Sequence, residues 1–291
     1  MDFMITAALM LDSTGITGGC KMTGEAKAQL NIALIQADIE IGNVNANMNK
    51  MLGMMEQAAA ADMKPDVIVL PEMWNTGYAL DRIQELADPM GQETSRMLSE
   101  FARKHRIQVV GGSVAERIED RIYNSMYVFN RSGEQIAKYS KIHLFRLMDE
   151  EKFLQAGQHT VTFELEQLKA GASICYDIRF PELSRTLALS GAQVLFVPAE
   201  WPHPRRHHWR TLLMARAIEN QMYVIACNRV GTSGETDFFG HSMIIDPWGE
   251  VIAEGDEQEM ILTGTLDCRL TDEVRERIPV FEDRRPNLYF Q

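Results

Sequence analysis

The chain has 291 residues, of which 45% are hydrophobic and 24% are charged, a composition typical of a globular protein with one sizeable core. Its formal net charge of −12 excludes the basic surface on which nucleic-acid binding depends. No apolar run approaches the roughly 18 residues of a membrane span, and four widely spaced cysteines without a Cys-x-x-Cys pair argue against a disulfide framework or a thiolate metal site.

Residues 1–25 differ from the rest of the chain. Residues 3–11 are almost entirely apolar, but no basic residue precedes them, whereas a secretory signal begins with basic residues. A glycine-rich stretch follows, and Met22 is a second potential start. We therefore expect a leader or an added extension without function at residues 1–25, and a single domain over residues 26–291.

The first half of this domain alternates predicted strands and helices. Residues 30–39 alternate apolar with small or polar residues and predict a strand. Residues 44–61 carry apolar residues at three- and four-residue spacing and predict a helix capped by Asn43. The other elements predicted here are strands at 66–70 and 107–114, a helix at 95–104, and a hairpin of residues 123–130 and 134–139.

The second half repeats this order. Its predicted elements are strands at 172–175, 193–197 and 222–227, helices at 181–190 and 207–220, and a hairpin of residues 241–245 and 250–253. Two pairs of segments also match locally: Val-Ile-Val-Leu-Pro-Glu72 with Leu-Phe-Val-Pro-Ala-Glu200, and Phe-Asn-Arg-Ser-Gly-Glu-Gln-Ile-Ala137 with Ile-Asp-Pro-Trp-Gly-Glu-Val-Ile-Ala253. This repetition predicts an α/β fold of two pseudo-symmetric halves, whose sheets pack face to face beneath outer helices.

Cys175 is the candidate nucleophile, because it lies where a short apolar strand stops and a helix is about to begin at Pro181. A thiol on such a turn is held by its backbone. Nearby N–H groups would lower the pKa of the thiol and stabilise an oxyanion at the carbon that it attacks. The alternative is a small core residue, since free cysteine is among the most buried residue types.

Two further polar residues follow predicted apolar strands: Glu72 and Lys141. With Cys175 they make a chemically sensible set for acyl transfer. Cys175 attacks a carbonyl, Glu72 takes the thiol proton, and Lys141 meets the negative charge on oxygen together with the N–H of Tyr176. The alternatives are a capping or surface role for Glu72 and a solvated charge for Lys141.

Four segments closely resemble the nitrilase superfamily of carbon–nitrogen hydrolases, and the match runs in the family's order from Leu30 to Pro286. The segments are Leu-Pro-Glu-Met-Trp-Asn-Thr-Gly-Tyr78, Tyr-Ser-Lys-Ile-His-Leu-Phe145, Ile-Cys-Tyr-Asp-Ile-Arg-Phe-Pro-Glu182 and Ala-Arg-Ala-Ile-Glu-Asn-Gln221. The resemblance implies a four-layer α-β-β-α sandwich. It also implies a homodimer or higher homo-oligomer, in which two sandwiches join into eight layers.

The resemblance also assigns roles. Glu72 matches the family's general base, Lys141 its oxyanion-stabilising lysine and Cys175 its nucleophile. Glu150 matches a second glutamate, because residues 153–157 align with the family's usual glycine ending; the neighbouring Glu151 is the alternative. The implied reaction is amide hydrolysis through a thioester on the cysteine, with release of ammonia.

Within the superfamily the chain is most similar to the ω-amidase-like branch, which cleaves small dicarboxylate monoamides such as 2-oxoglutaramate. Arg205 matches the arginine four residues after Trp201 and would hold the distant carboxylate by paired hydrogen bonds. Arg206 is the less favoured choice, and a surface ion pair of Arg205 is the alternative role. Arg179 is expected to be structural, tying the turn to Glu182 or Asp177.

Other functions are possible for a chain with this fold. An N-carbamoyl amine amidohydrolase or a nitrilase would keep the fold and chemistry, and an idle interaction module would keep the fold alone. The resemblance implies no cofactor and no metal, and Pro202 and Pro204 separate His203 from His207, so these histidines need not share a helix face. We expect a small amide as the ligand, no nucleic-acid or membrane partner, and a cytoplasmic location, since the cysteine pattern suits a reducing compartment.

Overall fold

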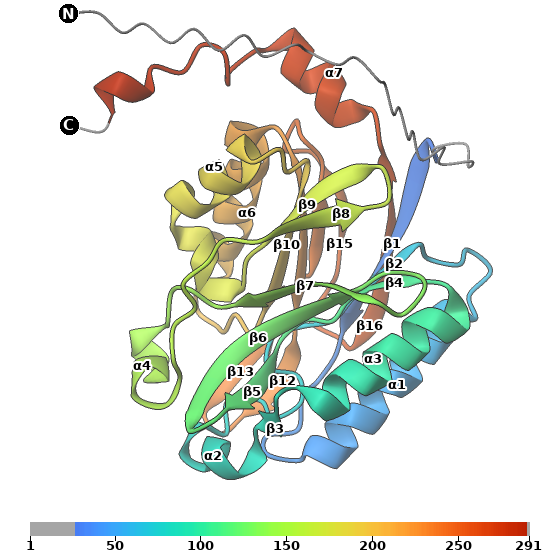
Figure 1. Cartoon of the computed structure of the whole chain (residues 1–291), viewed down its shortest axis with the longest axis vertical. Coiled ribbons are helices and arrows are strands. Elements are labelled where there is room, and N and C mark those ends of the chain that lie inside the picture. Colours follow the sequence, from blue (N-terminus) through green and yellow to red (C-terminus); the bar gives the residue numbers. More distant parts are fainter. Residues whose placement is uncertain (1–26, 290–291) are drawn as a thin grey trace, which may run out of the picture.

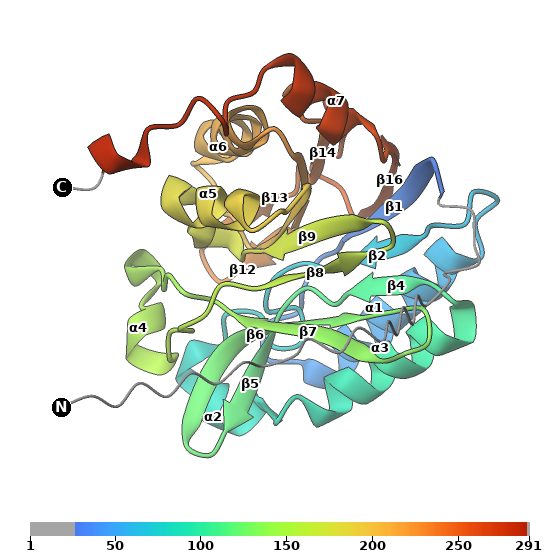
Figure 2. The ribbon, with the colours of Figure 1, turned by 45° about the horizontal axis from the view of Figure 1, so that its top comes forward.

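The computed structural model of the chain describes residues 27–289, so the expected leader at residues 1–25 lies outside the described residues. Two β-sheets lie face to face between two pairs of helices (Figures 1 and 2). Helices α1 (Val44–Ala59) and α3 (Gln92–His105) cover one sheet, and α5 (Pro181–Leu189) and α6 (Arg206–Asn220) cover the other. The predicted four-layer α-β-β-α sandwich is confirmed.

The first sheet contains eight of the described strands. Its order is β16-β1-β2-β4-β6-β5-β3, and β7 pairs with β6. The strands are β1 (Gln29–Gln36), β2 (Val67–Val69), β3 (Asp88–Pro89), β4 (Gln108–Val110), β5 (Val114–Ile118), β6 (Arg121–Phe129), β7 (Gln135–Ser140) and β16 (Met260–Asp267).

The second sheet contains six of the described strands, in the order β15-β14-β11-β10-β9-β8. They are β8 (Thr162–Leu165), β9 (Leu168–Ala172), β10 (Val194–Ala199), β11 (Tyr223–Asn228), β14 (Met243–Ile245) and β15 (Val251–Glu254). The remaining elements are the hairpin β12 (Val230–Ser233) and β13 (Thr236–Phe239), and the short helices α2 (Ile83–Leu86), α4 (Glu150–Phe153) and α7 (Leu270–Arg277).

The two halves share one topology. In the first sheet β1, β2 and β4 are parallel, and the antiparallel hairpin β6-β7 follows. In the second sheet β9, β10 and β11 are parallel, and the antiparallel hairpin β14-β15 follows. The predicted pseudo-symmetry is therefore present in the three parallel strands and the following hairpin of each half.

Alternation along β1 explains why the sheets stack. Leu30, Ile32 and Leu34 point towards the second sheet, whereas Ala33 and Ile35 pack under the outer helices. Helix α1 starts where predicted, because the Asn43 side chain accepts a hydrogen bond from the Ala46 N–H at 3.3 Å. Among residues 27–289 no helix is long and apolar enough to cross a membrane.

One predicted strand is wrong in its extent. Residues 107–114 do not form a single strand, because β4 ends at Val110 and the chain turns at Gly111 and Gly112 before β5 begins. Gly112 has a φ of +59°, and a side chain there would collide with the carbonyl oxygen of Pro71. The turn brings Ser113 against the loop after β2, where the Ser113 N–H donates to the Pro71 carbonyl at 3.0 Å.

Candidate active site

Polar residues from both sheets meet at the carboxyl ends of the strands. Glu72 follows β2, Lys141 follows β7, and Cys175 lies three residues after β9. Glu200 follows β10 and is the counterpart of Glu72 in the repeated halves. Because the strands of both halves end close together, this edge is where an open α/β sheet offers its site.

Cys175 occupies an unusual backbone position. The predicted strand over 172–175 is wrong in its bounds, because β9 runs from Leu168 to Ala172, and Cys175 begins a short 3-10 helix, Cys175–Arg179, with a φ of +46°. A non-glycine residue in this left-handed region is strained and persists only where its surroundings hold it. The cysteine is thus presented on a tight turn rather than at a strand end.

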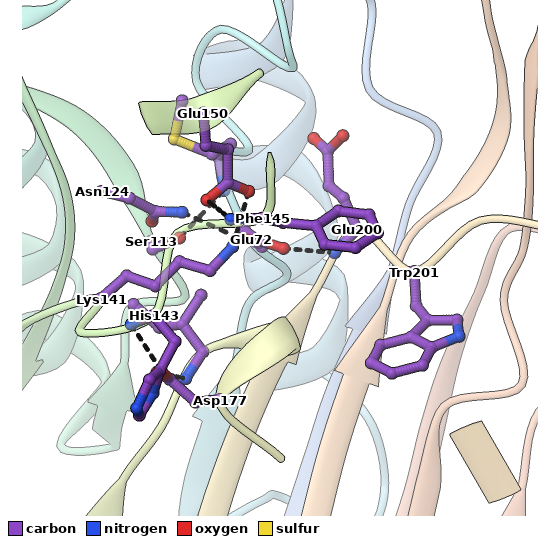
Figure 3. A network of polar contacts seen from close by, with 12 residues as sticks. Glu72, Ser113, Asn124, Lys141, His143, Phe145, Glu150, Asp177, Glu200 and Trp201 are labelled. Carbon is purple, nitrogen blue, oxygen red and sulfur yellow. Dashed lines mark hydrogen bonds and ion pairs between the residues drawn. The ribbon is translucent and has the colours of Figure 1, made fainter. Parts of the chain in front are cut away.

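A single carboxylate, that of Asp177, holds this turn. It accepts hydrogen bonds from the Ile174 N–H at 2.9 Å, the Tyr139 hydroxyl at 2.6 Å and the His143 N–H at 3.1 Å. The His143 ring nitrogen Nδ1 lies a further 2.7 Å from it (Figure 3). Tyr139 and His143 flank Lys141, so the carboxylate ties the cysteine turn to the segment that carries the lysine. The sequence did not predict this role for Asp177.

Lys141 lies between two carboxylates. Its Nζ donates to Glu72 Oε1 at 2.8 Å and to Glu150 Oε1 at 2.7 Å, and all three side chains are fully buried (Figure 3). An ammonium has three N–H donors, so one remains for another acceptor. The structure brings Glu150 to the lysine and leaves the neighbouring Glu151 exposed on the surface.

Glu72 is held by several donors. The Asn124 side chain donates to its Oε1 at 2.8 Å, and the Glu200 N–H donates to its Oε2 at 2.8 Å. The Tyr78 hydroxyl lies 3.0 Å from the same Oε1. None of these three partners was assigned a role from the sequence. Only Glu200 carried a signal, because it repeats the position of Glu72 in the second half.

Burial decides the charge of the cysteine. It raises the pKa of the Cys175 thiol well above its usual range, the Glu72 carboxylate adds to the rise, and the Lys141 ammonium opposes it. The expectation of a lowered pKa was therefore wrong. A buried thiol flanked by carboxylates keeps its proton at rest and needs a base to become a nucleophile.

The charges of the neighbours follow the same rule. Burial favours the neutral form of Lys141, but the attraction of Glu150 and Glu72 outweighs it and raises the pKa of the lysine well above its usual range. Burial raises the pKa of Glu150, against the attraction of Lys141, and raises the pKa of Glu200 to about 8. Lys141 thus stays positively charged, and burial makes the nearby carboxyl groups of Glu150 and Glu200 harder to ionise.

Cys175 faces a small cavity. The cavity is narrow, and aromatic side chains form much of its wall. Its lining consists of Tyr78, Phe145, Cys175, Tyr176, Arg179, Glu200, Trp201, Pro202 and Arg205. Cys175 therefore lies at the wall of a narrow cavity that also contains charged side chains, rather than among hydrocarbon alone.

Two arginines border this cavity. The Arg205 guanidinium lies 5.6 Å from the Phe145 ring centre, and that of Arg179 lies 4.7 Å from the ring centre of Trp201. Within residues 27–289 neither arginine forms an ion pair with an acid. The expected tie of Arg179 to Glu182 or Asp177 is wrong, because Asp177 is already occupied by backbone and ring donors.

The less favoured arginine has a different environment. Arg206 starts helix α6 and lies 3.4 Å from Glu257 on the surface. The histidines of this segment do not assemble a metal site, since no group of three potential ligands exists among the described residues. The cavity therefore offers a thiol, a buried ammonium, carboxylates and two guanidinium groups.

Comparison with known proteins shows the family of the chain. The family model described as carbon-nitrogen hydrolase matches residues 31–276. The chain belongs to the carbon–nitrogen hydrolase family. It is 47% identical over 258 residues to the 2-oxoglutaramate amidase of Bacillus subtilis, covering 89% of this chain and 98% of the relative. It is 33% identical to the human ω-amidase NIT2, covering 89% of this chain and 96% of the relative.

Solved structures place this carbon–nitrogen hydrolase in the nitrilase superfamily. Saccharomyces cerevisiae Nit3, a member of branch 10 of that superfamily, superposes with a TM-score of 0.81 at 30% identity and covers 87% of this chain and 96% of its own. A superfamily protein from Xanthomonas campestris superposes with a TM-score of 0.82 at 30% identity, covering 88% and 97%, and carries an arsenic adduct in its active site. The predicted family is confirmed.

Proposed function

We propose that this carbon–nitrogen hydrolase cleaves the terminal amide of 2-oxoglutaramate, or of a closely similar small amide bearing a carboxylate, and releases ammonia. The observation that carries the proposal is the small cavity in which Cys175 faces two guanidinium groups, of Arg179 and Arg205, that have no acidic partner among residues 27–289. The names of the Bacillus subtilis and human relatives support the same substrate class.

In the first half of the proposed reaction Glu72 acts as the base. It takes the thiol proton, and the Cys175 sulfur attacks the amide carbon. The remaining Lys141 N–H and the Tyr176 N–H stabilise the oxygen that becomes negative. Glu72 then passes its proton to the amide nitrogen, the carbon–nitrogen bond breaks, and ammonia leaves a thioester behind.

In the second half water replaces ammonia. Glu72 deprotonates a water molecule positioned with Glu150, and the water oxygen attacks the thioester carbon. The carbon–sulfur bond breaks, the proton on Glu72 returns to the Cys175 sulfur, and the carboxylic acid product leaves. One carboxylate therefore acts as base and as acid in each half, while Lys141 keeps its charge throughout.

The two arginines give the substrate its orientation in this proposal. A guanidinium binds a carboxylate through two parallel hydrogen bonds, and it does so most strongly where water is excluded. Arg205 remains the proposed main partner of the distant carboxylate. Arg179, on the same cavity wall, is a second contact that the sequence analysis had treated as structural.

Replacing Arg205 with alanine should change specificity more than chemistry. We expect kcat/KM for amides that carry a carboxylate to fall by about 10- to 100-fold, the usual loss for a charged hydrogen bond, with neutral amides of the same length little affected. Arg206→Ala is the matched control, because it removes the adjacent surface arginine. An equal loss on both substrate types would show that Arg205 has a structural role only.

Product analysis tests the proposed function against its rivals. The purified chain is given 2-oxoglutaramate, glutamine, an N-carbamoyl amine and a nitrile, and ammonia, carbon dioxide and amide products are measured. We expect ammonia from 2-oxoglutaramate at the highest kcat/KM. Release of carbon dioxide from the carbamoyl amine, or an amide intermediate from the nitrile, at a higher kcat/KM would replace the proposal with one of the other activities.

We also propose a homodimer or higher homo-oligomer that works in the cytoplasm. Ile218 on α6 and Trp248 in the β14-β15 turn are 52% and 37% exposed, and apolar exposure of this kind is typical of subunit contacts. The three described cysteines are free thiols, which suits a reducing compartment. Sedimentation of the purified chain as a monomer, or activity confined to an oxidising fraction of the cell, would contradict these proposals.

A further inference from the structure

Tyr78 is a residue of the cavity that the proposed reaction does not yet use. It follows Glu72 in the loop after β2, and its ring is partly buried while its hydroxyl reaches the buried carboxylates. The hydroxyl oxygen lies 2.6 Å from Glu150 Oε1 and 3.0 Å from Glu72 Oε1. Tyr78 also lines the cavity beside Cys175.

These contacts close a ring of four polar atoms. Lys141 Nζ touches the Oε1 atoms of Glu72 and Glu150 at 2.8 and 2.7 Å, and the Tyr78 oxygen touches the same two Oε1 atoms. Donors and carboxylate oxygens therefore alternate around the ring. A phenol has one proton, so Tyr78 donates mainly across the shorter contact, to Glu150.

The ring addresses a physical difficulty of the site. Two carboxylates in a buried space repel each other, and repulsion by Glu72 is one cause of the raised pKa of Glu150 after burial itself. Lys141 offsets this repulsion from one side. In the proposed reaction the third N–H of Lys141 donates to the substrate oxygen. A second link between the two carboxylates therefore needs another donor.

We propose that Tyr78 is a positioning residue of this reaction: its hydroxyl closes the ring opposite Lys141 and holds Glu72 and Glu150 side by side, so that the Glu72 carboxylate is placed to take the thiol proton. This inference rests on the proposed roles of Glu72 and Cys175.

The groups around the hydroxyl determine how the site responds to its loss. Glu72 and Glu150 lie at hydrogen-bond distance from the hydroxyl, and Lys141, Cys175 and Glu200 lie nearby. Arg229 forms an ion pair with Glu200 at 3.4 Å. Burial, and then the charge of Glu150, raises the pKa of the Tyr78 phenol well above its usual range, so it stays a donor. Without it Glu150 loses a donor to its ionised form, which raises the pKa of that carboxyl.

Tyr78→Phe tests the proposal by removing one oxygen atom. We expect kcat to fall by about 10- to 100-fold with KM nearly unchanged, and the acid limb of the pH profile of kcat/KM to move up by about one pH unit. Tyr223→Phe is the matched control, because it removes a buried hydroxyl that donates to the Asp267 carbonyl at 3.0 Å, away from the cavity. The control should keep the wild-type kcat and pH profile.

A second measurement separates this inference from the proposed substrate. Alkylation of Cys175 by iodoacetamide, followed by peptide mass spectrometry from pH 5 to pH 9, requires no substrate. We expect the acid limb of the alkylation rate to move upward in Tyr78→Phe and to stay in place in Tyr223→Phe. This result would support the role of Tyr78 even if 2-oxoglutaramate proved not to be the substrate.

The double variant completes the test. If Tyr78 acts through Glu150, adding Tyr78→Phe to Glu150→Gln should lower kcat by clearly less than the product of the two single effects. Unchanged pH limbs in both assays, or a Tyr78→Phe variant that loses only thermal stability, would overturn the proposal and leave Tyr78 a packing residue. Fully multiplicative effects in the double variant would overturn it as well.

Discussion

Cys175→Ala should abolish amide hydrolysis while leaving the fold intact. We expect kcat for ammonia release from 2-oxoglutaramate to fall by at least about 10⁴-fold, because no thioester is able to form and the remaining groups stabilise only an uncatalysed attack by water. Alanine fits the turn no worse than cysteine does, since both adopt the φ of +46° at similar cost. Steady-state ammonia release at saturating substrate measures the effect.

Cys227→Ala is the matched control for that loss. Cys227 is also fully buried, but its Sγ lies 3.3 Å from the Ile35 carbonyl oxygen and 3.5 Å from that of Val69, between the sheets and away from the cavity. This variant should lose some stability and retain the wild-type kcat. Equal ammonia release by wild type and Cys175→Ala would remove the cysteine mechanism altogether.

Lys141→Ala should damage both catalysis and stability. Turnover should fall by roughly 10²- to 10³-fold, the usual loss for an oxyanion donor. Removing the ammonium also leaves Glu72 and Glu150 buried without a counter-ion, and breaking a buried pair costs about 3–5 kcal/mol of unfolding free energy. Measurements of kcat and of urea unfolding on the same preparations test both parts.

The stability loss in Lys141→Ala should depend on pH. Without the ammonium, burial and the charge of Glu72 hold the pKa of the Glu150 carboxyl in the folded state further above its unfolded value. A carboxyl whose pKa is higher in the folded state than in the unfolded state stabilises the fold while it is protonated, below its unfolded-state pKa near 4.5. This stabilisation is lost as pH rises through its folded-state pKa. We therefore expect a larger deficit in unfolding free energy at pH 8 than at pH 5. A deficit that is equal at both pH values would contradict the buried ion pair.

Lys138→Ala separates the two effects of Lys141. Lys138 on β7 pairs with the buried Glu116 on β5, so its loss also leaves a buried carboxylate without a counter-ion. Lys138 lies outside the catalytic cavity. This control should be less stable and keep its kcat. Comparable losses of kcat in both variants would show that Lys141 acts through stability alone.

The division into two similar halves could be predicted from the sequence because local patterns occur twice along the chain. Apolar alternation in β1 and the paired segments ending at Glu72 and Glu200 are properties of neighbouring residues, and they were sufficient to predict two similar halves. The same reasoning placed Glu72 and Cys175 near strand ends. Choosing between Glu150 and Glu151 required the family resemblance, since both residues are glutamates in one short turn.

The contacts that organise the site could not be predicted in this way. Asn124 reaches Glu72 across 52 residues, and Tyr139 reaches Asp177 across 38. No local pattern records which distant side chain will meet a buried carboxylate. The same holds for Tyr78 and for the guanidinium of Arg179, which lies over the Trp201 ring and 3.4 Å from His208 Nδ1.

The pKa of the nucleophile shows the limit of motif-based reasoning most clearly. A thiol at the start of a helical turn is expected to ionise easily, but Cys175 is buried beside Glu72 and Glu150, and these effects raise its pKa instead. Which effect wins depends on burial and on charges that come from other segments. The result makes a neighbouring base part of the mechanism rather than an accessory.

Trapping the acyl-enzyme is the most direct test of the central claim that Cys175 attacks the amide carbon. The enzyme is mixed with 2-oxoglutaramate, quenched in acid within its turnover time and digested for peptide mass spectrometry. We expect the Cys175 peptide to gain the mass of 2-oxoglutarate less one water, and hydroxylamine to remove the addition. An acyl group on another residue, or turnover that continues while Cys175 stays unmodified, would contradict a cysteine nucleophile.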